Sequence, residues 1–98
     1  MNMKHIFGLF ATIHASDVLN LSDLKLTHID KSHFSKNVMM DDLDLSKNLL
    51  TKLGEDLFSE LPVLLSLNLS DNKLKGLPKD IFYMLTSLTT LDLSKNDS

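Results

Sequence analysis

The chain has 98 residues, of which 43% are hydrophobic and 23% are charged, and its formal net charge is -3. This composition is ordinary for one small folded domain, and the acidic balance gives no general attraction to nucleic acid or anionic lipid. The chain contains no cysteine, which excludes disulfide frameworks, thiolate metal sites and cysteine nucleophiles. It also contains no run of about 18–20 apolar residues, the length needed to span a bilayer.

The N-terminal segment, residues 1–15, has two interpretations. A weakly basic start precedes an apolar run over residues 6–13 and then small residues, which is the outline of a secretory signal peptide. However, Phe10 and Ile13 fall at apolar positions of the repeat described next. The segment is therefore alternatively the tail of a preceding repeat.

A unit of 24 residues repeats along most of the chain. The hexapeptide LDLSKN occurs at 43–48 and again at 91–96, and a near copy, LNLSDN, lies between them at 67–72. If Leu64 is position 1 of a unit, apolar residues recur at positions 1, 4, 6, 11, 14, 19 and 22, and asparagine recurs at position 9. The units follow one another without insertion: 16–39, 40–63, 64–87 and a partial unit, 88–98.

The first half of each unit predicts a short strand with alternating faces. In SLNLSD, Leu67 and Leu69 are expected to point inward, while Ser66, Asn68 and Ser70 point outward. Strands of successive units are expected to pair in parallel and form a sheet. The asparagine at position 9 is expected to satisfy backbone groups of its own and neighbouring units that would otherwise be buried without a partner.

The second half of each unit predicts a return loop outside the sheet. Phe34, Phe58 and Phe82 share position 19 and are expected to stack under these loops. The stretches EDLFSEL and KDIFYMLTS are candidates for single helical turns. Because each unit contacts only its neighbours, at least about three units are needed for a stable stack.

The pattern resembles that of the leucine-rich repeat family, L-x-x-L-x-L-x-x-N-x-L, over residues 16–98. The variable half, as in LPKDIFYMLTS, is similar to the typical 24-residue subclass, which is common in extracellular and receptor proteins such as Toll-like receptors and Slit-like matrix proteins. The resemblance implies an α/β solenoid with a short-stranded parallel sheet on its concave face and loops or single helical turns on its convex face.

The resemblance also implies a non-catalytic protein-protein interaction module in an extracellular or cell-surface receptor-type protein. The alternative is an intracellular, cytoplasmic adaptor or regulatory protein of the same family. The residues favour no enzyme, because the position-7 serines have no positioned histidine beside them and no phosphate-binding glycine loop is present. No cofactor is expected.

Departures from the pattern occur at both ends of the repeat region. Ser16, Leu24 and Asn37 replace a leucine, the asparagine and an apolar residue of the first unit, as is common in a terminal unit that caps a stack. The chain stops two residues after Asn96, so the sequence predicts an uncapped strand edge. Such an edge favours self-association, and we expect the chain to be a fragment of a longer array.

The outward strand positions are the candidate binding surface, because a concave sheet is long and rigid. We expect a protein or peptide partner with a basic patch, because aspartates make the centre of this face acidic. The alternative interpretation is that these are solvated, variable surface positions. The predicted partner-binding residues are Asp42, Asp44, Ser66, Asn68, Thr90 and Asp92.

Three further patterns have structural interpretations beside functional ones. Asn20 and Asn68 begin N-x-S sequons and are possible glycosylation sites in a secreted protein, although the repeat itself supplies the serine. The residues at position 8 alternate Asp, Lys, Asp, Lys, and opposite charges of neighbouring units are expected to lie side by side. His28 and His33 lie near Asp30, where surface histidines are a better interpretation than metal ligands.

Overall fold

The computed structural model describes residues 17–34 and 39–97. Within them, four strands of three residues form one sheet, and a single 3-10 turn, η1 (Lys31–His33), follows the first strand. The strands are β1 (Val18–Asn20), β2 (Asp42–Asp44), β3 (Ser66–Asn68) and β4 (Thr90–Asp92), and they are adjacent in sequence order. The expected signal peptide or preceding repeat, residues 1–15, lies outside the described residues.

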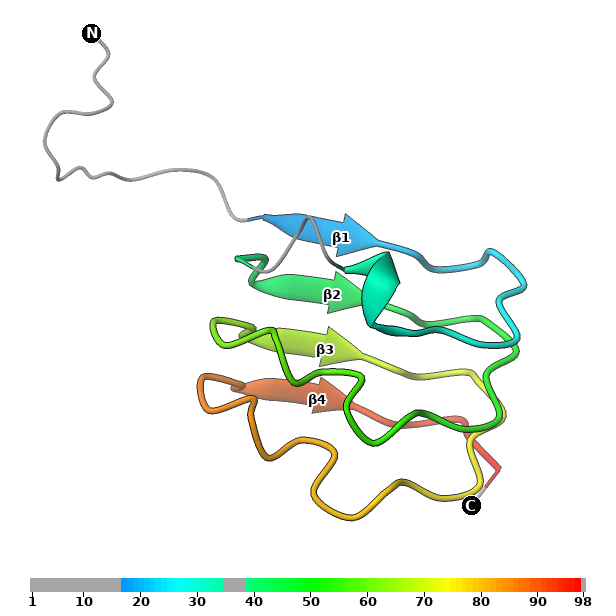
Figure 1. Cartoon of the computed structure of the whole chain (residues 1–98). Coiled ribbons are helices and arrows are strands. Elements are labelled where there is room, and N and C mark those ends of the chain that lie inside the picture. The colour runs from blue at the N-terminus through cyan, green and yellow to red at the C-terminus, as the bar shows by residue number, and fades with distance from the viewer. Residues whose placement is uncertain (1–16, 35–38, 98) are drawn as a thin grey trace, which may run out of the picture.

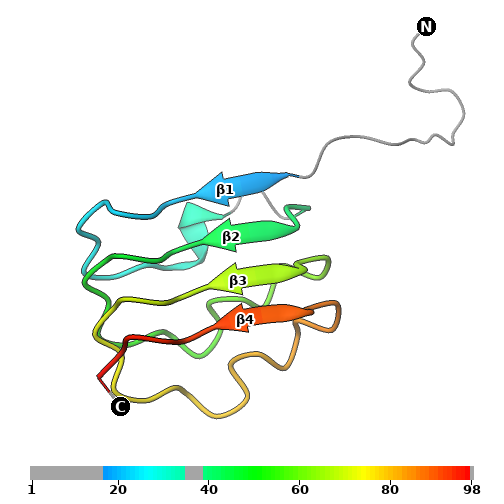
Figure 2. The same cartoon turned by 180° about the vertical axis from the view of Figure 1, so that it is seen from behind.

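All four strands run in parallel, and each residue pairs with the residue 24 positions further along the chain. Leu19 pairs with Leu43, Leu43 with Leu67, and Leu67 with Leu91. The connecting loops all lie on one side of the sheet (Figure 1). The opposite view looks onto the open face of the sheet, with the loops behind it (Figure 2). The predicted parallel sheet is therefore confirmed.

The core lies between the sheet and the return loops. Leu43, Leu45, Leu67 and Leu69 have no exposed surface, whereas the alternating strand residues remain partly exposed. A shift of the register by one residue would move these leucines to the solvent face. The constant 24-residue spacing thus gives every strand the same inward side.

The three phenylalanines at position 19 form a stack through the core. The ring centroids of Phe34 and Phe58 are 6.4 Å apart with a 20° interplanar angle, and those of Phe58 and Phe82 are 6.0 Å apart with a 17° angle. Phe34 and Phe58 are buried, and Phe82 is half-buried. The predicted stack is confirmed, and it joins three consecutive loops.

The convex loops contain successive short hydrogen-bonded turns. The Leu57 N–H donates to the Gly54 carbonyl, and the Leu61 N–H donates to the Phe58 carbonyl, three residues earlier in each case. EDLFSEL and KDIFYMLTS contain turns of this kind but no regular helix.

Candidate functional site

The parallel register brings the predicted partner-binding residues together on one face in two rows. Asp42, Ser66 and Thr90 are paired neighbours in one row. Asp44, Asn68 and Asp92 form the second row, two residues further along each strand. The side chains at the β4 end of the face are exposed, and those of β2 and β3 are half-buried. The strand backbones hold both rows rigidly.

The side chains of the second row also bond to their own chain. The Asp44 Oδ1 accepts hydrogen bonds from the Ser46 N–H at 2.9 Å and from the Ser46 hydroxyl at 2.6 Å. The same pair of bonds recurs in the other three units, from Ser22 to Asn20, from Ser70 to Asn68 and from Ser94 to Asp92. The residue at position 5 therefore closes a local turn.

This bond explains why position 5 accepts either asparagine or aspartate. Both side chains offer an Oδ1 acceptor, and the serine at position 7 needs only that oxygen. Sequence reasoning placed position 5 on the outward face but missed its bond to position 7. The recurring pair D/N-x-S in every unit was the signal that could have shown it.

Hydrogen bonding also lowers the pKa of Asp92. The Ser94 hydroxyl, and then the Ser94 N–H, lower the pKa of the Asp92 carboxyl below its usual value, because both donate to the ionised form. The nearby Lys95 adds a smaller effect in the same direction. These bonds therefore favour the ionised form of Asp92, which is exposed on the sheet face.

The two predicted glycosylation sites take part in this same turn. The Oδ1 atoms of Asn20 and Asn68 accept from the serines of their own sequons at 2.7 Å. Asn20 is exposed and Asn68 is half-buried. A glycan is attached to the Nδ2 atom, so the bond to the serine does not use the atom that would be modified. Glycosylation of these residues stays a prediction.

The charges at position 8 form no ion pairs with one another within the described part of the chain, where the lysine ion pairs are those of Lys31. Their side-by-side placement stays a prediction. Their common property is instead a left-handed backbone. The residues and their φ values are Asp23 (57°), Lys47 (57°), Asp71 (57°) and Lys95 (56°). The column is therefore a turn position, and its charges are solvated.

The asparagines at position 9 connect neighbouring units. The Asn72 Oδ1 accepts from the Leu50 N–H at 3.1 Å, and its Nδ2 donates to the carbonyls of Leu45 and Leu69 at 3.0 and 3.2 Å. Asn48 and Asn96 make the equivalent bonds one unit before and one unit after. The predicted ladder is confirmed. The N–H of Leu24, the residue that departs from the ladder, donates to the Asn48 Oδ1 at 3.1 Å.

Two comparisons with known proteins agree with this geometry. The family model described as "Leucine rich repeat" matches residues 15–74 and 39–97. The chain belongs to the leucine-rich repeat family. The crystal structure of the leucine-rich repeat domain of APL1B is similar, with a TM-score of 0.67 and 26% identity over 82% of this chain. The match covers 32% of that chain, so this chain spans about a third of its length. No curated protein matches.

The family and solenoid fold predicted from the repeat are thus confirmed. A leucine-rich repeat is a protein-interaction scaffold that is typically non-catalytic. Within residues 17–34 and 39–97, no three His, Cys, Asp or Glu side chains are grouped as metal ligands would be. In the same part of the chain, no helix is long and apolar enough to cross a membrane.

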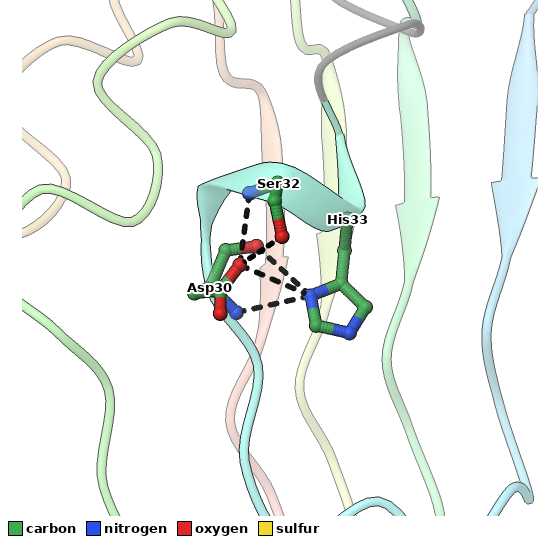
Figure 3. A network of polar contacts seen from close by, with 3 residues as sticks. All are labelled: Asp30, Ser32 and His33. Carbon is green, nitrogen blue, oxygen red and sulfur yellow. Dashed lines mark hydrogen bonds and ion pairs between the residues drawn. The ribbon is translucent and has the colours of Figure 1, made fainter.

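The histidine of η1 has a structural role in this leucine-rich repeat. The Asp30 N–H donates to the His33 Nδ1 at 3.2 Å, and the Asp30 Oδ1 accepts from the Ser32 N–H at 2.9 Å and from the Ser32 hydroxyl (Figure 3). These bonds form a capping box at the start of the turn. The Ser32 hydroxyl bond is the main cause of the lowered pKa of the exposed Asp30 carboxyl. The Nδ1 of His28 lies 3.4 Å from the hydroxyl oxygen of Thr27.

Proposed function

We propose that this leucine-rich repeat segment is the ligand-binding part of an extracellular or receptor-type protein, and that its concave face binds a protein or peptide with a basic patch. The observation that carries the proposal is the pair of in-register rows on the sheet. A rigid surface loses little conformational freedom on binding, which favours affinity.

The charge of the face supports a basic ligand. Asp42, Asp44 and Asp92 lie in the two rows, and none of them has an ion-pair partner among the described residues. A lysine or arginine side chain approaching this face meets uncompensated negative charge, which accelerates association and selects for basic partners.

The experiment selects binding peptides from a phage-displayed random library, with the intact chain as the target. We expect enrichment of peptides that contain Lys or Arg. The charge-removing variant is Asp42→Ser with Asp44→Asn and Asp92→Asn. Its design follows the repeat: Ser66 already occupies the first position in β3, and Asn68 occupies the second. The two asparagines keep the Oδ1 acceptor that the turn needs, so the fold is preserved.

Binding of the enriched peptides should weaken by about tenfold or more in the triple variant, since each rim charge is worth a fraction of a kcal/mol to about 1 kcal/mol. The control is Asp97→Asn, which removes one exposed charge outside the two rows. Equal binding to the wild type and the triple variant would reject the concave face as the site, and so would selection of neutral peptides only.

The extracellular assignment rests on the N-terminal apolar run and on the sequons at Asn20 and Asn68, together with the resemblance to Toll-like and Slit-like repeats. Expression in animal cells followed by intact-mass measurement tests it. Loss of about fifteen N-terminal residues, the length of a short signal segment, or added glycan mass supports secretion. An intact, unglycosylated cytosolic product favours the alternative, an intracellular adaptor or regulatory protein.

We further propose self-association through the outer edge of β4. The exposed fraction of Leu91 is 39%, whereas its equivalent in β3, Leu67, is fully buried by the next unit. The Leu69 N–H donates to the Asp92 carbonyl, but the equivalent N–H, that of Leu93, has no such strand beside it among the described residues. An apolar, unpaired edge of this kind favours association with another chain.

A further inference from the structure

A second surface lies on the convex side, between the return loops of the second and third units. It contains a pocket of about 250 Å³. Tyr83 and Met84 stand at this pocket with exposed fractions of 75% and 50%. One unit earlier, the same two positions carry Ser59 and Glu60. Exposed tyrosine and methionine side chains are enriched in protein interfaces, so the third unit departs from the second in the direction of a binding surface.

The charges between the second and third return loops differ from those between the first and second return loops. Between the first and second units, the Lys31 Nζ lies 3.5 Å from an Asp56 carboxylate oxygen and 3.7 Å from a Glu60 carboxylate oxygen. The partners are thus 25 and 29 residues further along the chain. In the next unit along the chain, Glu55 stands at the position equivalent to Lys31, and Asp80 stands at the position equivalent to Asp56.

Two carboxylates therefore line the pocket at the positions that a lysine and a carboxylate occupy in the preceding gap. Glu55 and Asp80 both line it, as does Lys79. No ion pair involves any of these three residues within the described part of the chain, where the ion pairs are those of Lys31 and of His33. The carboxylates outnumber the single lysine, so the pocket is complementary to a cation.

We propose that this pocket binds an arginine side chain of a partner protein. The guanidinium group takes the place that the Lys31 ammonium has in the preceding gap and bonds to Glu55 and Asp80. Its planar face stacks on the exposed ring of Tyr83, and the Met84 side chain packs against its methylene groups. The site is separate from the concave face, so it goes beyond the function proposed above.

The test is an NMR titration of the intact 98-residue chain, with ¹⁵N label, against N-acetyl-arginine amide. The uncharged isostere, N-acetyl-citrulline amide, is the matched control probe. We expect saturable shifts at the amides of residues 55 and 79–84 with the arginine probe and weaker shifts with citrulline. The proposal is overturned if the two probes give equal responses, if the arginine probe gives no saturable response, or if the shifts map to β2 and β4 alone.

Two variants distinguish a loss of binding caused by the pocket's side chains from a loss caused by unfolding. Glu55→Lys introduces the lysine of the first gap and is expected to pair with Asp80. It should abolish saturable binding while leaving the urea midpoint unchanged or higher. Tyr83→Ser copies Ser59 and should raise the Kd by about two- to fivefold, the effect of an exposed cation–π contact. Wild-type affinity in Glu55→Lys would refute the proposal.

Asp97→Asn, which lies outside both the convex pocket and the concave rows, is the control variant and should bind the arginine probe as the wild type does. If the concave face does not select basic peptides, the outcome of this titration is unchanged. If the arginine probe does not bind to the convex pocket while the peptides still bind to the sheet face, only the convex-pocket proposal is rejected. The two proposals are therefore distinguished by their own variants.

Discussion

At the residue scale, one side-chain oxygen atom determines which residues fit position 5 of each unit. The Asp92 Oδ1 and its equivalents accept the N–H and hydroxyl of the serine two residues later, which makes aspartate and asparagine interchangeable there. An outward strand position is thus both part of the proposed binding face and part of the turn that ends the strand. Substitutions that test binding at this position must keep the acceptor.

The bond from Ser94 predicts the titration of Asp92. The pKa of this carboxyl is lowered by the Ser94 hydroxyl and N–H, so the stabilisation is present above the unfolded value, about 3.9, and is lost as the pH falls through the lower folded value. In Ser94→Ala the pKa of Asp92 should rise toward its usual value. NMR titration of the side-chain carboxyl carbon measures the change.

The control for this titration is Ser22→Ala, which removes the same bond from Asn20, three units away. It should leave the pKa of Asp92 where it is in the wild type. An identical pKa in Ser94→Ala and in the wild type would show that the hydroxyl bond does not stabilise the ionised form.

At the element scale, each repeat unit consists of a strand, a turn and a return loop. Two kinds of contact connect it to the neighbouring units. The asparagine ladder joins the turns, and the phenylalanine stack joins the loops. The ladder bonds are directional and lie in a buried environment, where an unsatisfied group is costly. They therefore set the spacing of the units more strictly than apolar packing does.

Removing one rung of the ladder should destabilise the chain strongly. Asn72→Ala leaves the Leu50 N–H and the Leu45 carbonyl with fewer partners at a buried site. We expect the free energy of unfolding to fall by about 2–4 kcal/mol, from one or two unsatisfied buried groups. Urea unfolding followed by circular dichroism measures the loss.

Asn96→Ala is the comparison for this change. Asn96 makes equivalent bonds but is half-buried, so water can replace part of the lost bonding and the destabilisation should be smaller. Equal losses in the two variants would mean that burial does not control the strength of the ladder.

At the scale of the whole molecule, the described residues form a one-dimensional stack in which each of the four strands contacts only its neighbours in the sheet. Stability in such a stack comes from interfaces between adjacent units. The central strands have a neighbour on both sides and bury their leucines completely, whereas Leu91 in β4 is partly exposed. The outer side of β4 is therefore the edge through which we propose that the chain associates.

Self-association through this edge should depend on concentration and on Leu91. Sedimentation velocity at rising concentration should detect dimers or larger species of the wild-type chain, and Leu91→Lys should suppress them. The matched control is Leu49→Lys, because Leu49 is also 39% exposed but lies at a position that is lysine in two other units. A wild-type chain that is monomeric throughout, or equal suppression by both variants, would contradict the prediction.

The sequence by itself determined the family, the parallel register, the inward leucines, the asparagine ladder and the phenylalanine stack. These follow from periodicity, because a constant 24-residue spacing places equivalent side chains beside one another in every unit. The period did not reveal the backbone conformation at position 8. Asp23 and Lys47 share a left-handed φ, and the period gives no information about backbone dihedral angles.

Only the tertiary structure decided how side chains at different positions of the unit meet. The contact of Lys31 with Asp56 spans 25 residues, and the opposing carboxylates of the convex pocket follow from the same offset. Such contacts cross between columns of the repeat, so aligning the units by their period does not reveal them. They depend on the path of the return loops, which is set by packing over the core rather than by the spacing of the leucines.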